Sequence, residues 1–171
     1  MRSTEFAWMA GIVDMKGRIH RKTHAHRRTH QVTLGVETKE TAVIERLSRM
    51  TGTQPEMRSA RALSDMIRRG CTEHCPEPHI HVDEHLSWPK FGRWTISGAG
   101  LVVVLTNLSP FIQVDRGYAA VIDEVVTETV VEGRGSTAIL ASVNRLQGLG
   151  WTIPEPYAKA LEERLLASLQ S

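Results

Sequence analysis

The chain has 171 residues, of which 41% are apolar and 23% are charged; this is the composition of a globular protein with one core, and not of a disordered segment. Its longest apolar run, "LVVVL", is too short to span a membrane, and the first residues, "MRSTEFAWMAG", are too polar for a secretion signal. We therefore expect a cytoplasmic protein without a membrane partner.

The N-terminal residues predict a helix followed by a hairpin. Ser3 or Thr4 can cap the helix, and Gly17 is expected to end it in a left-handed conformation. One stripe of this helix is expected to consist of Phe6, Met9, Ala10, Val13 and Gly17. An alternating strand over 18–23, a turn over 25–28 and a second strand over 29–38 follow. Val32, Leu34 and Val36 should share the apolar face of the second strand.

The hairpin is strongly basic, although the net charge of the chain is only +2. Between Met15 and Val36 there are six Lys or Arg and four His residues, but no acid. Acidic residues gather instead between 115 and 132. A basic face on a nearly neutral protein is the electrostatic pattern of a polyanion-binding surface.

The remaining residues predict an α+β domain. We expect helices over 39–52, 99–112, 115–131, 137–150 and 154–170, and a strand over 93–98. Residues 61–70 could form a strand or a short helix, and 70–92 a loop. This order favours one antiparallel sheet with helices on one face and the basic residues on the other. The core is expected to span 1–133, with 134–171 forming a helical C-terminal extension packed on it.

The stretch "WMAGIVDMKGRI" resembles the LAGLIDADG motif of homing endonucleases, with Met9–Gly17 on its nine positions. The predicted order resembles the αββαββα core of that family, and "ISGAGLVVVLTNLSPFI" with the following Gln113–Arg116 resembles its later strand and helix. The resemblance covers about residues 5–130. It implies a LAGLIDADG-like fold with a saddle-shaped sheet that binds duplex DNA. Because only one motif is present, it also implies a homodimer through the first helix and a pseudo-palindromic target.

The family chemistry is metal-dependent phosphodiester hydrolysis, for which the eighth motif position supplies an acid that holds Mg²⁺. Lys16 occupies that position here, and an ammonium group donates hydrogen bonds and repels a cation. Asp14, two residues earlier, points about 200° away around the helix, so we expect it to bond backbone near the helix end or across the dimer. The sequence thus predicts a DNA-binding protein that has lost nuclease activity, acting as a regulator or accessory factor in a bacterial or phage-infected cell.

Three other interpretations stay open. Lys16 could be a solvated cation that favours the helix dipole. The chain could be an active endonuclease with an atypical Mg²⁺ site that uses Glu37, Glu40 or another acid. It could also be an RNA-binding factor of the maturase type, because the saddle of this family also serves intron RNA.

The basic residues of the hairpin are the candidate DNA contacts. Lys and Arg would hold phosphates, while Arg and Gln can also read bases. The strand register, which decides the residues that share a face, is not set by the sequence. The candidates are Lys16, Arg18, His20, Arg21, Lys22, His24, Arg27, Arg28, His30, Gln31 and Thr33.

A second motif, "CTEHCPEPHIH", lies in the loop 70–86. Thiolates and imidazoles are preferred zinc ligands, and four of them complete a structural site. We expect structural zinc on Cys71, Cys75, His79 and His81, with His74 or His85 as substitutes. The alternative is a polar loop with two free thiols.

Overall fold

The computed structural model describes residues 2–24, 29–58, 91–114, 116–131, 136–159 and 162. Several predictions lie outside this part of the chain. They are the turn over 25–28, the uncertain element over 61–70, the Cys/His loop, and the last predicted helix beyond residue 159 except for residue 162.

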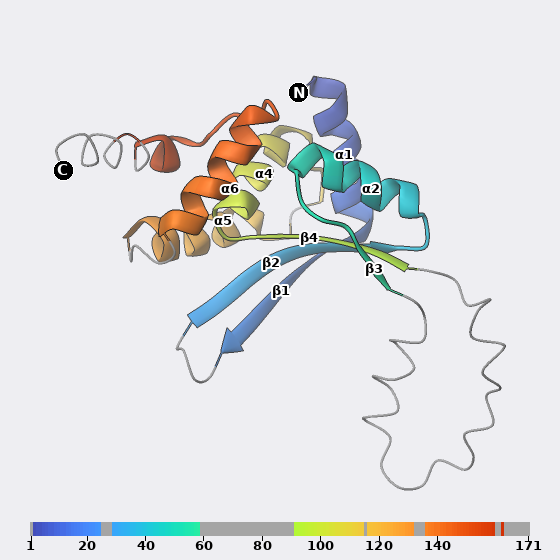
Figure 1. Cartoon of the computed structure of the whole chain (residues 1–171), viewed down its shortest axis with the longest axis horizontal. Coiled ribbons are helices and arrows are strands. Elements are labelled where there is room, and N and C mark those ends of the chain that lie inside the picture. Colours follow the sequence, from blue (N-terminus) through green and yellow to red (C-terminus); the bar gives the residue numbers. More distant parts are fainter. Residues whose placement is uncertain are drawn as a thin grey trace, which may run out of the picture.

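Four strands form one antiparallel sheet in the order β1-β2-β4-β3. The strands are β1 (Gly17–His24), β2 (Thr29–Thr38), β3 (Glu56–Arg58) and β4 (Phe91–Ser97). Helix α1 (Ser3–Lys16) precedes them, α2 (Thr41–Thr51) separates the two strand pairs, and α4 (Gly98–Leu108) follows β4. The predicted α-β-β-α-β-β-α order and the α+β class are therefore confirmed, and Figure 1 shows the helices gathered on one side of the sheet.

The sheet has one buried and one open face because its side chains alternate. Val32, Leu34 and Val36 of β2 are at most 2% exposed, as predicted. On β4, Trp94 and Ile96 are buried in the same way, whereas Phe91, Arg93, Thr95 and Ser97 between them are partly exposed. The helices therefore cover the apolar face, and no element in the described part of the chain covers the polar face.

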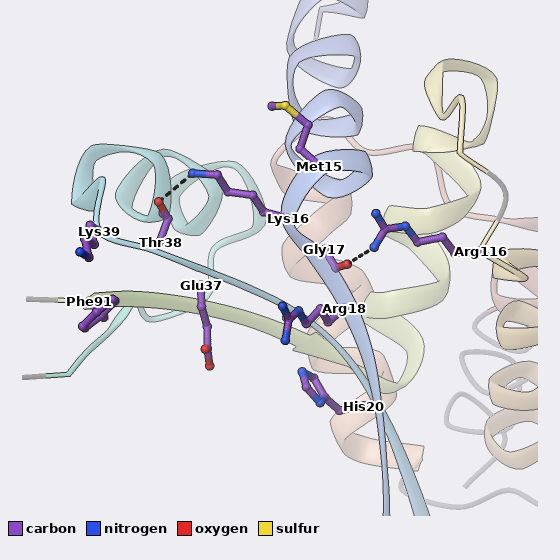
Figure 2. A pocket seen from close by; sticks show the side chains of 11 residues that line it. Met15, Lys16, Gly17, Arg18, His20, Glu37, Thr38, Lys39, Phe91 and Arg116 are labelled. Atoms are coloured by element: carbon purple, nitrogen blue, oxygen red, sulfur yellow. Dashed lines mark hydrogen bonds between the residues drawn. The ribbon is translucent and has the colours of Figure 1, made fainter. Parts of the chain in front are cut away.

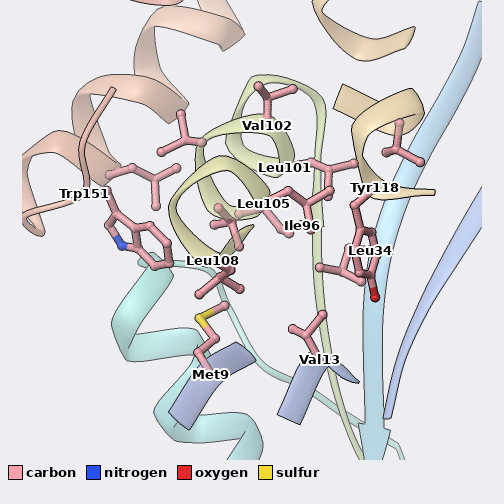
Figure 3. Packing of buried hydrophobic residues seen from close by; sticks show 14 of the residues in the cluster. Met9, Val13, Leu34, Ile96, Leu101, Val102, Leu105, Leu108, Tyr118 and Trp151 are labelled. Atoms are coloured by element: carbon pink, nitrogen blue, oxygen red, sulfur yellow. The ribbon is translucent and has the colours of Figure 1, made fainter. Parts of the chain in front are cut away.

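The helices after β4 complete the core. The turn η2 (Ser109–Phe111) follows α4 at Pro110, and α5 (Tyr118–Val126), η3 (Thr127–Val131) and α6 (Ser136–Gly148) come next. Trp151 packs with Met9 of α1 and Leu108 of α4 in one cluster (Figure 3). Its indole N–H donates to the Met50 carbonyl at 2.8 Å, so the C-terminal segment shares the core of the N-terminal elements. No helix in the described ranges is long and apolar enough to cross a bilayer.

Two predictions about α1 are wrong. Its N-cap is Arg2 and not Ser3 or Thr4, because the Glu5 carboxylate accepts the Arg2 N–H at 2.9 Å. Gly17 does not adopt a left-handed conformation but starts β1 with φ −68° and ψ 138°. A Cβ at this position would lie 2.5 Å from the Val13 carbonyl oxygen, so the glycine allows a close approach of backbone.

One strand was not predicted, and one helix begins later than predicted. Strand β3 lies at 56–58, where the short sequence carries no alternation, and it forms only by pairing with β4. Helix α5 begins at Tyr118 because Gly117, with φ 71°, interrupts the helical backbone just before it. By contrast, α2 ends as predicted at Gly52, which is left-handed with φ 65°.

Candidate functional site

A cavity of about 660 Å³ lies where the C-terminus of α1 meets the sheet. Its walls come from the end of α1, the starts of β1 and β4, the last residues of β2 and the segment before α5. Five basic side chains line it: Lys16, Arg18, His20, Lys39 and Arg116. Glu37 is the acidic residue among the lining side chains, so the cavity is predominantly cationic.

Lys16 extends from the tip of α1 toward the start of α2 (Figure 2). Its ammonium donates to Thr38 Oγ1 at 3.0 Å and lies 3.7 Å from Glu40 Oε1. The Glu40 N–H donates to the same Thr38 oxygen at 3.3 Å. The side chain is 35% exposed, so Lys16 is anchored at the junction of β2 and α2 and still faces the cavity.

Asp14 bonds backbone, as expected from its position. Its carboxylate accepts the Gln113 N–H at 2.9 Å and the Val114 N–H at 3.4 Å. Both donors precede α5, about a hundred residues away in sequence. Asp14 thus ties the end of α1 to this segment and its carboxylate is occupied there.

Arg116 makes the complementary contact, which sequence reasoning missed. Its guanidinium donates to the carbonyls of Gly17, at 2.7 Å, and of Asp14. The last carbonyls of a helix have no partner within the helix, and Arg116 supplies donors for them (Figure 2). The sequence signal was a basic residue in the segment that resembles the family, but its partners could be found only from the fold.

The open face of the hairpin carries Arg18 and His20. In the register, Arg18 pairs with Gly35, His20 with Thr33 and Lys22 with Gln31. Paired residues of antiparallel strands share a face, so Gln31 and Thr33 lie on this face with Arg18 and His20. Figure 2 shows Arg18, His20 and Glu37 on the side of the strands away from α2.

Arg21 lies on the opposite face of β1. It pairs in register with Val32, a buried residue of the helix-covered face. Its Nε and Nη2 lie 3.1 Å and 3.0 Å from Glu124 Oε2 of α5. Arg21 is therefore separated from Arg18 and His20, although it belongs to the same basic run of the sequence.

The described acids around the cavity, Asp14, Glu37 and Glu40, are not arranged as a site that fits Mg²⁺. Glu37 Oε1 forms an ion pair with Arg93 Nε at 3.2 Å across β2 and β4, Glu40 faces Lys16, and Asp14 is bonded to backbone. Mg²⁺ prefers carboxylate and water oxygens in an octahedral arrangement, whereas these carboxylates are turned to cations and amides. Within the described ranges, no three His, Cys, Asp or Glu side chains gather as a metal site would require.

The other candidates are placed only in part. Lys22, His24 and His30 lie on β1 and β2, where only their backbone is described. Arg27 and Arg28 lie outside the described residues, as do all the proposed zinc ligands, Cys71, Cys75, His79 and His81 with their substitutes His74 and His85.

Comparison with known proteins gives structural similarities alone. No protein-family model and no curated protein sequence matches the chain. The structure of the homing endonuclease I-CvuI with its target is 15% identical, with a TM-score of 0.47 over 86% of this chain and 80% of that chain. A second structure of the same enzyme, with the I-CreI target in the presence of Mg and with the DNA not cleaved, has the same sequence identity, TM-score and coverages.

The archaeal intron-encoded homing endonuclease I-Vdi141I, complexed with DNA, is also similar to this chain. It is 13% identical, with a TM-score of 0.45 over 85% of this chain and 79% of that chain.

Proposed function

We propose that this chain is a homodimeric, sequence-specific duplex-DNA-binding protein of the LAGLIDADG homing endonuclease type that has lost nuclease activity. The observation that carries the proposal is the uncovered polar face of the sheet, on which Arg18 and His20 continue the cationic cavity at the tip of α1. The motif resemblance over Met9–Gly17 supports the assignment to this type.

A two-stranded ribbon fits the major groove of B-DNA, where base edges present distinct donor and acceptor patterns. Arg18, Gln31 and Thr33 lie on the open face of such a ribbon. Arginine can hold phosphate or guanine, and glutamine can pair with adenine. Lys22, His24, Arg27, Arg28 and His30 remain candidates from the sequence, but we leave Arg21 out because its guanidinium is bonded to Glu124 on the other face.

Lys16 supports binding without cleavage. An ammonium has three N–H donors, and Thr38 accepts one of them at 3.0 Å, which leaves donors that can reach a phosphate in the cavity. The same ammonium opposes a divalent cation. Because the nearby acids are turned to cations or amides, no described carboxylate replaces the acid that the family uses here.

The exposed side of α1 supports a homodimer. Ala7 is exposed, Gly11 is half-buried and Met15 is 70% exposed, and their spacing of four residues places them on one side of the helix. A Cβ at Gly11 would meet no atom within 4 Å, so a second helix could approach closely there. Ala10 has a different role, because it is fully buried in the core of its own chain.

The test begins with a pool of random-sequence duplexes, from which the protein selects its target, followed by anisotropy titrations at several salt concentrations. We expect binding of the selected duplex over a structured RNA hairpin, with affinity falling as salt rises because phosphate contacts release counterions. Arg18→Ala should weaken binding and flatten the salt dependence, whereas Arg49→Ala, on α2, should change neither.

Other results would overturn the proposal. A preference for the RNA hairpin would favour the maturase-like alternative. Nicking of the selected duplex in Mg²⁺ or Mn²⁺ by the unaltered protein would show an active endonuclease. If the protein–DNA complex sedimented with one protomer, the proposed homodimer would be contradicted.

A further inference from the structure

We propose that Arg21 and Glu124 form a brace that sets the position of the β1–β2 ribbon for DNA binding, and that Arg21 acts on affinity through this brace and not by touching DNA. The inference rests on the proposed function. It assigns to an arginine of the basic hairpin a role that its sequence context does not indicate, because its neighbours Arg18 and His20 occupy the other face.

The outer half of the hairpin extends beyond the four-stranded part of the sheet. Strand β4 pairs with β2 only over Thr33–Thr38. The paired residues 21–24 and 29–32 therefore form a two-stranded ribbon, with β1 at the edge of the described sheet. Figure 1 shows this ribbon projecting past the end of β4 and beneath the helices. A two-stranded hairpin is marginally stable without further packing.

Arg21 is the first residue of that extension, and it reaches α5. Its Nε donates to Glu124 Oε2 at 3.1 Å, and Nη2 lies 3.0 Å from the same oxygen. Two donors on one carboxylate define the direction of the guanidinium better than a single contact does. Beside it, Val32 is buried on the same face, so the brace lies where the apolar support of the ribbon ends.

The consequence concerns the residues farther out. Lys22 and Gln31 pair with each other directly beyond Arg21, and Arg27 and Arg28 follow β1 in the sequence. If the ribbon changed its direction at Arg21, these candidate contacts would be displaced from the DNA groove, while Arg18 would stay in place. The side chains of the pair are 54% and 32% exposed, so the effect should be modest and should weaken with salt.

The experiment compares Arg21→Gln, Glu124→Gln and the exchanged pair Arg21→Glu with Glu124→Arg. Glu155→Gln, which removes an exposed acid from the C-terminal segment, is the matched control. If Arg21 acts as a brace, each single glutamine variant should lower affinity for the selected duplex by about two- to fivefold at low salt, and this difference should shrink as salt rises. The exchanged pair should recover affinity, and Glu155→Gln should not lower it.

Glu124→Gln separates the brace from a direct contact. If Arg21 touched DNA, removing its acidic partner would free the guanidinium, and affinity would rise or stay equal; that result overturns the proposal. So does an exchanged pair that binds no better than the single variants. Hydrogen exchange of the free protein tests the brace without DNA: Glu124→Gln should speed exchange at residues 21–24 and 29–32 but not at 33–38. If Glu124→Gln speeds this exchange but the unaltered protein binds no DNA, the brace is supported and the proposed function is rejected.

Discussion

Lys16 occupies the position on which the proposed loss of nuclease activity depends. Its amine is bonded to Thr38 and near Glu40, yet it lines the cationic cavity. These contacts differ from those of a freely solvated lysine. The residue thus stabilises the tip of α1 and remains available for a phosphate.

Lys16→Asp should lower duplex affinity by about tenfold in the absence of divalent ions, because a carboxylate replaces a phosphate-facing cation and lies beside Glu40. Adding Mg²⁺ should recover part of the loss by bridging carboxylate and phosphate. Anisotropy with and without Mg²⁺ measures both effects, and Lys16→Met is the uncharged control. Equal affinities of all three proteins would remove Lys16 from the binding surface.

Two buried tyrosines offer a matched test of pH dependence. Burial raises the pKa of Tyr118 above 10, with Arg116 lowering it and Asp14 raising it further. Burial also raises the pKa of Tyr157, against the hydrogen bond with Thr129. A raised pKa means that the folded state keeps the proton longer than the unfolded state does. The stability that the two neutral tyrosines contribute is therefore fully present below pH 10 and is lost as the pH rises above it.

The phenylalanine variants should differ at neutral pH. The Tyr118 hydroxyl is buried and has no hydrogen-bond partner among the described residues, so Tyr118→Phe should be neutral or stabilising by up to about 1 kcal/mol. Tyr157→Phe loses a 2.6 Å hydrogen bond to Thr129 and should cost about 1 kcal/mol. In urea unfolding near pH 7 and above pH 10, both variants should lose less stability with pH than the unaltered protein. If both variants lost as much stability with pH as the unaltered protein does, the pH effect would belong to other groups.

The junction of α1 and β1 depends on one glycine, since the helix passes into the strand without a loop. Gly17→Ala should destabilise the chain by about 1 to 3 kcal/mol, because its Cβ would press on the backbone carbonyl of Val13, which cannot rotate away. The midpoint of urea unfolding measures the loss. An unchanged midpoint would show that the junction can shift.

Gly11 is the matched glycine on the same helix. An added Cβ there meets nothing within 4 Å, so Gly11→Ala should stabilise an isolated protomer by about 0.5 to 1 kcal/mol. If α1 packs against a second copy, the same methyl should weaken the dimer. Sedimentation at several concentrations reports the dissociation constant, and a dimer of equal or greater strength would place the interface elsewhere.

In the described part of the fold, one group of cations and one group of acids lie on different sides of the sheet. The cationic cavity and Arg18 lie on the open side of the sheet, whereas the acids of α5, including Asp123 and Glu124, lie in the helical layer. A two-fold axis along α1 would bring two such open faces side by side. The resulting field would attract a duplex and orient it on the sheet.

The Cys/His loop remains a proposal from the sequence. Protein purified without added zinc should contain close to one zinc per chain, and replacing Cys71 and Cys75 together by serine should release it, because thiolates are strong zinc ligands. Elemental analysis with a thermal melt measures both. A metal-free protein with the same melting temperature would leave two free thiols.

Local patterns of the sequence were sufficient for much of the fold. Alternation in 29–38 identified β2 and its buried face, Gly52 marked the end of α2, and the element order followed from such segments. These features depend on residues a few positions apart, which interact in any fold that contains the element. The resemblance of Met9–Gly17 to the motif, with Lys16 at its eighth position, comes from the sequence alone and stays a prediction.

Long-range contacts decided the rest. The register placed Arg21 and Arg18 on opposite faces, although both belong to one basic run. The pairing of Arg21 with Glu124 and of Asp14 with Gln113 joins residues about a hundred positions apart, and β3 exists because β4 is beside it. No local pattern encodes such pairs, because their energy arises only when the packed core brings distant segments together.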